Sequence, residues 1–108
     1  MATVTLVPAS GSITHGATAV RVNVDAATVN DITAYTTSVY PTSPELRYYL
    51  TFEMGGAEYG RSYVFTPNSD GDHEFNNYIF PEAGSWTVHL RSTADDSSVA
   101  NSGAVTVA

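Results

Sequence analysis

The sequence contains no cysteine and no lysine, and only 14% of its 108 residues are charged. The absence of cysteine excludes disulfides and thiolate metal sites, and it leaves the redox compartment unreadable. Without lysine, four arginines stand against 11 acidic residues, which gives a formal net charge of −7. Nucleic acids and anionic membranes require clustered cations, and these arginines are scattered singly along the chain, so we expect neither partner.

Long hydrophobic runs are also missing. No apolar run approaches the roughly 20 residues of a membrane helix. The N-terminal stretch MATVTLVPASG has neither the basic region nor the apolar core of a secretory signal peptide. No linker or internal repeat divides the chain, and 43% of its residues are hydrophobic. Residues 1–108 are therefore expected to form a single domain with its own core.

No segment sustains a helical period, and alternating patterns bounded by turn residues predict β-strands instead. In VRVNVD, for example, three β-branched valines share one face of a strand. Gly60 predicts a bulge, and TADDSSVANSG (93–103) predicts a turn. The expected strands are Thr3–Val7, Ala17–Asp25, Leu46–Met54, Ala57–Phe65, Glu74–Phe80, Ser85–Ser92 and Ala104–Ala108, with Ile32–Tyr40 as a possible eighth. Seven or eight short strands at regular spacing indicate an antiparallel sandwich or barrel.

The stretch FPEAGSWTVHL contains a turn followed by a strand. Glu82, Gly84, Trp86 and Val88 stand where immunoglobulin-like domains place an acidic residue, a glycine, an aromatic and a buried apolar residue or cysteine. From about Tyr78 to the C-terminus the chain resembles the immunoglobulin-like and PKD-like modules of bacterial and phage proteins. The resemblance implies an all-β, immunoglobulin-like antiparallel sandwich of seven to eight strands without a disulfide. An indole N–H from the tryptophan can replace the hydrogen bond of the usual tyrosine hydroxyl.

Residue patterns that carry catalysis are absent. None of the three histidines has a second histidine at metal-ligand spacing, and His89 alternates away from the apolar face of its strand. The chain has no Gly-x-Ser-x-Gly run and no glycine-rich phosphate loop. We therefore predict no catalytic activity and no cofactor.

The loop PNSDGDHE offers one alternative to this negative result. Asn68, Asp70 and Asp72 alternate as the first calcium ligands of an EF-hand loop do. However, Gly71 is misplaced for that loop, and no glutamate closes it at the right distance. The same residue types also favour turns, and we prefer that interpretation.

Tyrosines are numerous, and they supply the candidate binding residues. Tyr35 and Tyr40 lie in the long segment 26–45, which is proline-bearing near its end, and Tyr49 alternates outward beside Tyr48. Exposed tyrosines favour interfaces because they offer apolar area and a polar tip at low entropic cost. Packing over a short sheet edge explains them equally well. Tyr48 and Tyr63 are expected in the core.

These expectations lead to a non-catalytic structural or binding protein. An initial methionine, no signal peptide and one complete immunoglobulin-like domain favour a bacteriophage capsid decoration protein on the virion surface, docked on the major capsid protein or another virion protein. The alternatives are a phage tail component with an immunoglobulin-like fold, or an immunoglobulin-like or carbohydrate-binding module of a bacterial surface protein or glycosidase. A host-surface glycan is the alternative partner.

Overall fold

The structure, a computed structural model, describes residues 2–28 and 47–108. In these ranges the chain forms eight strands and no helix, so the described part contains no helix long and apolar enough to span a membrane. The strands are β1 (Thr3–Val7), β2 (Val20–Asp25), β3 (Tyr48–Met54), β4 (Ala57–Arg61), β5 (His73–Tyr78), β6 (Gly84–Ser92), β7 (Ser98–Asn101) and β8 (Val105–Val107).

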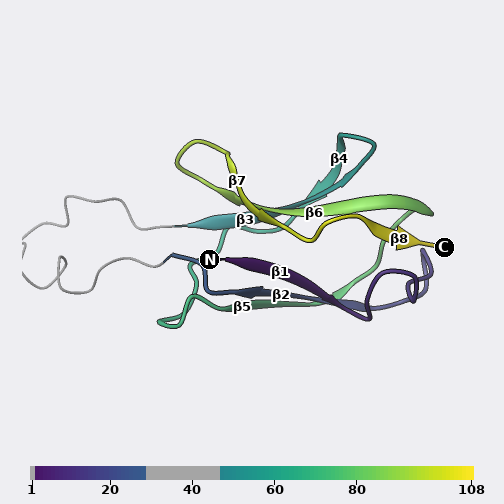
Figure 1. The fold of residues 1–108 in the computed structure, drawn as a ribbon, viewed down its shortest axis with the longest axis horizontal. Coiled ribbons are helices and arrows are strands. Elements are labelled where there is room, and N and C mark those ends of the chain that lie inside the picture. Colours follow the sequence, from purple (N-terminus) through teal and green to yellow (C-terminus); the bar gives the residue numbers. More distant parts are fainter. Residues whose placement is uncertain (1, 29–46) are drawn as a thin grey trace, which may run out of the picture.

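Two antiparallel sheets stack as the layers of a sandwich (Figure 1). The smaller sheet has the strand order β1-β2-β5, and the larger sheet has the order β4-β3-β6-β7. β8 pairs with the N-terminal residues of β6, from Gly84 to Trp86. The predicted all-β antiparallel sandwich of seven to eight strands is confirmed, and its arrangement is compatible with an immunoglobulin-like fold.

Alternation along the central strands builds the core. Alternate residues of β2 and β6 point between the sheets, and six of them are fully buried. These residues are Val20, Val22, Val24, Trp86, Val88 and Leu90. Each such burial stabilises the fold by about 1.5–3 kcal/mol. The period-two pattern read from the sequence therefore identifies the inner faces of both sheets correctly.

Trp86 is the largest of these side chains, and none of its surface is exposed. Its indole N–H donates a hydrogen bond of 2.9 Å to the carbonyl oxygen of Glu82, so the predicted hydrogen bond from the indole is confirmed. The indole also makes edge contacts with Phe80 and Tyr59, at centroid distances of 5.1 Å and 5.3 Å. This tryptophan therefore ties the turn before β6 to the core.

The stretch 93–103, predicted as a turn, contains the strand β7, and that prediction was wrong. The turn itself is short, because Asp96 N donates to Ser92 O at 2.8 Å and Ser92 N donates to Ser97 O at 3.0 Å. The chain then pairs with β6, with Ala100 opposite Leu90. The residues SVAN have only weak strand propensity. Their backbone is extended because it pairs with the edge of β6.

Strand ends differ more modestly elsewhere. β4 ends at Arg61, earlier than the predicted Phe65, yet Ser62 and Phe65 continue to hydrogen-bond with β3. The predicted bulge is confirmed, because Gly60 pairs with Phe52 while Glu58 already pairs with the next residue of β3. The possible strand Ile32–Tyr40 lies outside the described residues.

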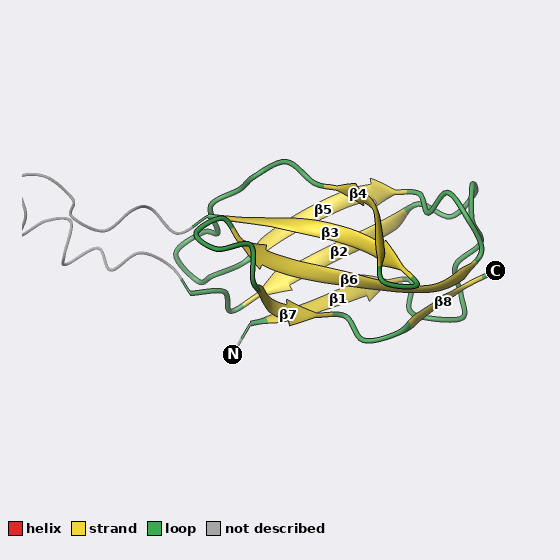
Figure 2. Cartoon of the chain, turned by 90° about the horizontal axis from the view of Figure 1, so that it is seen from above, coloured by secondary structure: helices red, strands yellow, loops and turns green. Residues whose placement is uncertain are grey.

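The two long sides of the sandwich are closed to different degrees. On one side, residues 11–15 run beside β8: Gly11 N donates to Thr106 O at 3.0 Å, and Ala108 N donates to Ile13 O at 2.9 Å. On the opposite side, β4 and β5 end their respective sheets (Figure 2). No backbone hydrogen bond joins these two strands within the described ranges. Backbone hydrogen bonds therefore close the side at β8, whereas the side between β4 and β5 is open.

We expect Trp86→Ala to lower the free energy of unfolding by about 3–5 kcal/mol, because it removes a fully buried aromatic side chain. Trp86→Phe keeps an aromatic ring but loses the N–H donor, so it should cost about 1–2 kcal/mol. Urea unfolding of the three proteins measures both values. A loss below about 1 kcal/mol for the alanine variant would contradict the central place of this residue.

Gly71 allows a second test, because the loop before β5 packs against the end of β2 at this residue. Its φ is +83°, and an added Cβ would collide with the carbonyl oxygen of Ala27. Gly16 has a similar φ of +68° but open space around it. Both alanine variants bear the strain of a positive φ, about 1–2 kcal/mol. Gly71→Ala should cost at least about 2 kcal/mol more than Gly16→Ala in the same unfolding assay, because backbone must also move. Equal losses would contradict this packing.

Candidate functional site

Polar side chains gather on the outer face of the larger sheet. Alternation along β3 places Tyr49, Thr51 and Glu53 on that face, and the register of β6 sets His89 opposite Thr51 and Arg91 opposite Tyr49. A polar group on a sheet face meets its cross-strand neighbours at close range. The pairing of β3 with β6 therefore assembles this cluster.

Glu53 is the centre of the cluster, and its side chain is only 14% exposed. Its Oε2 accepts hydrogen bonds from Arg91 Nη2 at 2.8 Å and from Thr51 Oγ1 at 2.7 Å. Burial by itself raises the pKa of a carboxyl, but the hydrogen bonds from Arg91 and Thr51 outweigh it, and the pKa of Glu53 is lowered. His89 Nε2 lies 3.9 Å from the same oxygen and adds to the lowering.

Tyr49 is on the outer face, as its alternation predicts, but it is not exposed. Only 5% of its surface is accessible, because the guanidinium of Arg61 lies 5.0 Å above its ring centroid and its hydroxyl donates to Asp96 Oδ1 at 2.6 Å. This hydrogen bond raises the pKa of Tyr49, so the hydroxyl stays protonated. A binding role for Tyr49 stays a prediction. Tyr35 and Tyr40 lie outside the described residues.

A hollow of about 280 Å³ opens beside Tyr49 on this face. Its arginines are paired within the chain: Arg91 with Glu53, and Arg61 with Glu58 through two hydrogen bonds of 2.8 Å and 2.9 Å. The hollow is lined by Tyr49, Glu53, Gly56, Glu58, Arg61, Arg91 and Asp96. Because both arginines are paired within the chain and Asp96 accepts from Tyr49, the arrangement fits a role in holding the β3–β4 hairpin and the 93–97 turn against the sheet.

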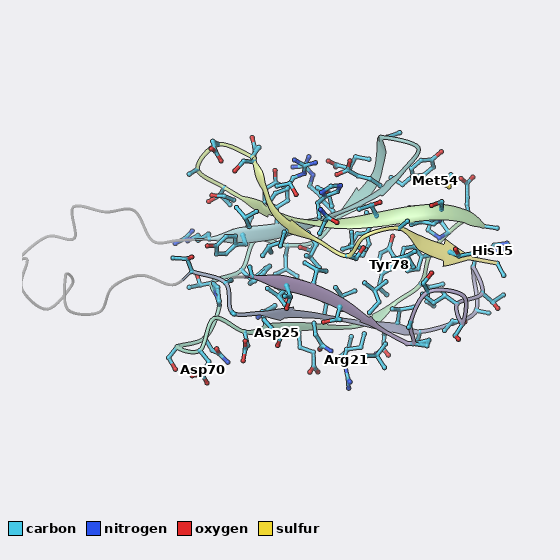
Figure 3. The ribbon with its side chains drawn as sticks, in the orientation of Figure 1. His15, Arg21, Asp25, Met54, Asp70 and Tyr78 are labelled. Atoms are coloured by element: carbon cyan, nitrogen blue, oxygen red, sulfur yellow. The ribbon has the colours of Figure 1, made fainter. Side chains whose placement is uncertain are left out.

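The hydrogen bonds of the loop 67–74 agree with the turn interpretation. Asn68 Oδ1 accepts from the backbone N–H groups of Asp70 at 3.0 Å and Asp72 at 2.9 Å, and Asp72 Oδ1 accepts from the N–H of Ala26 at 3.1 Å. Asp70 projects from the tip of the loop (Figure 3). Within residues 2–28 and 47–108, no three acidic, histidine or cysteine side chains gather at metal-binding distance. Calcium binding by Asn68, Asp70 and Asp72 remains the alternative to the turn interpretation.

The sequence did not indicate the apolar strip along the open side of the sandwich. Tyr63 was predicted in the core, and that was wrong: it is 62% exposed. Its ring bridges to β5, with its hydroxyl 2.9 Å from His73 Nε2 and its centroid 4.8 Å from that of Phe75. Tyr59 and Val64 are 49% and 51% exposed. We call Tyr59, Tyr63 and Val64 the edge strip.

The histidine beside the edge strip is partly buried between aromatic rings. His73 stacks on Phe65 at a centroid distance of 4.3 Å. Burial lowers the pKa of His73, and the nearby carboxylate of Glu74 only partly offsets this. The ring is therefore neutral at pH 7 and hydrogen-bonds with the hydroxyl of Tyr63.

Comparison with protein-family models, curated proteins and solved structures found no significant match to this chain. A functional assignment therefore rests on the chemistry and geometry of the described residues. Two features stand out: an outer-face cluster with internally paired charges, and an exposed edge strip on the open side.

We expect the Glu53 carboxylate to make stability depend on pH. Because its pKa in the fold is lowered from about 4.5, its contribution is present above that pH and is lost as the pH falls through the folded pKa. Glu53→Gln should therefore cost about 1–3 kcal/mol at pH 7, and this gap to the wild type should shrink as the solution is acidified below pH 4.5. Unfolding free energies measured across this range test the expectation.

Glu58→Gln is the matched control for this experiment. It makes the same chemical change in the same hairpin, but the side chain of Glu58 is 37% exposed and pairs with an exposed arginine. Its effect should be small throughout, because solvent screens such pairs. A constant gap between wild type and Glu53→Gln at all pH values would show that the carboxylate charge contributes nothing.

Proposed function

We propose that this protein is a non-catalytic binding module, and that it serves as a capsid decoration protein on a bacteriophage virion. The observation that carries the proposal is the edge strip on the open side of the sandwich. Exposed tyrosines beside unpaired edge strands are the features through which small β-domains dock on other proteins. In this role the open side meets the capsid, and the remaining surface faces solvent.

The arrangement of the charged side chains supports a role without catalysis. Glu53 and Arg91 neutralise each other, as do Glu58 and Arg61. A catalytic pair needs a nucleophile or acid within reach of a positioned base and of a substrate cavity. Two hydroxyl–histidine pairs do occur, Ser98 with His89 at 2.8 Å and Tyr63 with His73 at 2.9 Å, but the exposed apolar surface is better suited to protein contact.

Two further features support the viral setting. The residues Glu82, Gly84, Trp86 and Val88 carry a resemblance to immunoglobulin-like modules of phage and bacterial proteins. The edge strip is also small, so a single contact would be weak. Many copies on a regular shell bind more tightly together than one copy does, because weak contacts are repeated. Such avidity suits a capsid lattice better than a soluble partner.

Carbohydrate binding is the second candidate, and the exposure of the tyrosines is the observation that favours it. Tyr59 and Tyr63 present ring surface at one edge, and sugar rings stack on such surfaces. A module of a bacterial surface protein that binds glycans would use them in this way. A phage tail component would use the same strip for protein contact.

Mixing the purified protein with undecorated phage capsids, and separately with a glycan array, distinguishes these functions. We expect saturable capsid binding without glycan binding. Tyr63→Ser should weaken capsid binding about tenfold, as loss of an interface aromatic does. Val99→Ser, which removes an exposed apolar side chain from β7, is the matched control and should leave binding unchanged. Binding to one glycan class that Tyr63→Ser abolishes, without capsid binding, would establish the carbohydrate-binding alternative instead.

A further inference from the structure

We propose that the free edge of β5 accepts an extended segment of a partner protein as a fourth strand of the smaller sheet, and that this segment alternates apolar and basic residues. The inference rests on the proposed function for its setting, because it names the surface and the chemistry of the partner. It follows from three observations: β5 has a free edge, exposed apolar side chains lie beside that edge, and the outward face next to it is acidic.

The free edge of β5 follows from the unequal sheets. Tyr78 of β5 stacks on Phe52 of β3 at a centroid distance of 3.7 Å, and Figure 3 shows Tyr78 between the sheets. β5 is thus opposite β3 at this point. The larger sheet continues to β4, whereas the smaller sheet ends at β5.

The backbone of β5 is available for pairing. Within the described ranges, β5 pairs with β2 alone, so its second edge is free. The pairing with β2 is regular at His73, Glu74 and Phe75, and a register shift follows, with Asn77 at a φ of +61°. Bulges limit edge pairing. The added strand is therefore short and pairs with residues 73–76.

The edges of the sandwich at β8 and at β4 are less open. Residues 11–15 already run beside β8. β4 carries its own bulge at Gly60 and an exposed ion pair between Glu58 and Arg61. Bulges and exposed charges are the devices that protect edge strands against addition. β5 combines a free edge with neighbouring apolar surface.

The edge strip provides apolar surface beside the free edge of β5. Tyr63 crosses from the larger sheet to β5, where its ring packs on Phe75, and Tyr59 reaches inward to Trp86 from β4. Both tyrosines retain about half or more of their surface in solvent. Alternate side chains of an added strand point to the same face. Those facing inward would meet these rings, so they are expected to be apolar.

The outward face beside β5 is acidic. Glu74 is exposed on it, and with Asp25 and Asp72 it borders a hollow of about 420 Å³. Arg21, on the same face of β2, lies toward the other end of the strand, opposite Val7 (Figure 3). Outward side chains of an added strand next to Glu74 are therefore expected to be basic.

The same charges argue against a second copy of this chain as the occupant. Antiparallel pairing of two β5 edges would bring their Glu74 side chains near each other, and each copy carries a net charge of −7. Like charges across neighbouring strands are destabilising. A basic segment of a different protein would instead be attracted by Glu74 and by the net negative charge of the chain.

The test uses two synthetic peptides of six residues, the length of β5. One alternates valine and lysine, and the other alternates valine and glutamate. Titration of each into the labelled full chain is followed by NMR. We expect the valine–lysine peptide to shift the backbone amide signals of residues 73–76, while those of β1, the opposite edge of the same sheet, stay in place. Shifts confined to β1 or β4, or none, would overturn the proposal.

Charge reversal at one residue gives a sharper test. Glu74→Lys should weaken binding of the valine–lysine peptide about two- to fivefold and strengthen binding of the valine–glutamate peptide by a similar factor. Glu82→Lys makes the same change in net charge in the turn before β6, and it should affect neither peptide appreciably. Equal effects of both variants would mean that only net charge matters, and would overturn the proposed site.

Capsid binding separates this inference from the proposed function. If capsids bind and excess valine–lysine peptide or Glu74→Lys weakens that binding, both stand. If capsids bind unaffected and the peptide shifts nothing on β5, the proposed function stands and the β5 inference is wrong. If the peptide binds at β5 but capsids do not bind, the inference stands and the function is wrong. Dimers formed through β5 in sedimentation experiments would show that a second copy is the occupant, and would overturn the inference.

Discussion

The pairing of β3 with β6 is the interaction on which the rest of the structure depends. Its register, from Tyr48 opposite Ser92 to Met54 opposite Trp86, runs without a bulge. Because side chains alternate across a sheet, this one register fixes both faces at once. It turns Trp86 into the core and sets Arg91 beside Glu53 on the outside. A slip of one residue would exchange the two sets, so the core and the outer cluster are specified together.

The sandwich built on this pair is asymmetric at its two long sides. Backbone hydrogen bonds from residues 11–15 close the side at β8, whereas side chains alone cover the side between β4 and β5. There, Tyr63 spans the sheets through His73 and Phe75 and remains largely exposed. A backbone ladder excludes a partner strand, while a cover of side chains leaves the edge accessible. The two sides of the sandwich therefore differ in how accessible their edge strands are.

Most of the strands were predictable because their burial follows local alternation, as in β2 and β6. β7 was not, because SVAN is extended on account of the β6 edge that it joins and not because of its own residues. The candidate site was harder to predict from the sequence than the strands were. Alternation predicted correctly that Tyr49 faces outward, but Arg61 and Asp96 cover it from a neighbouring strand and a distant turn. Tyr63 was expected in the core, and its exposure results from the edge position of its segment.

The sequence by itself determined the all-β class, the inner faces of the strands, the bulge at Gly60 and the donor role of the Trp86 indole. These depend on period-two patterning and on residue chemistry, which are local properties. Only the tertiary structure decided which strands are edges, which tyrosines stay exposed and how the charges pair. Those features arise from contacts between segments far apart in the chain, such as Arg91 with Glu53 or Tyr63 with His73. Edge position is a property of sheet order, and no pattern within a single strand encodes it.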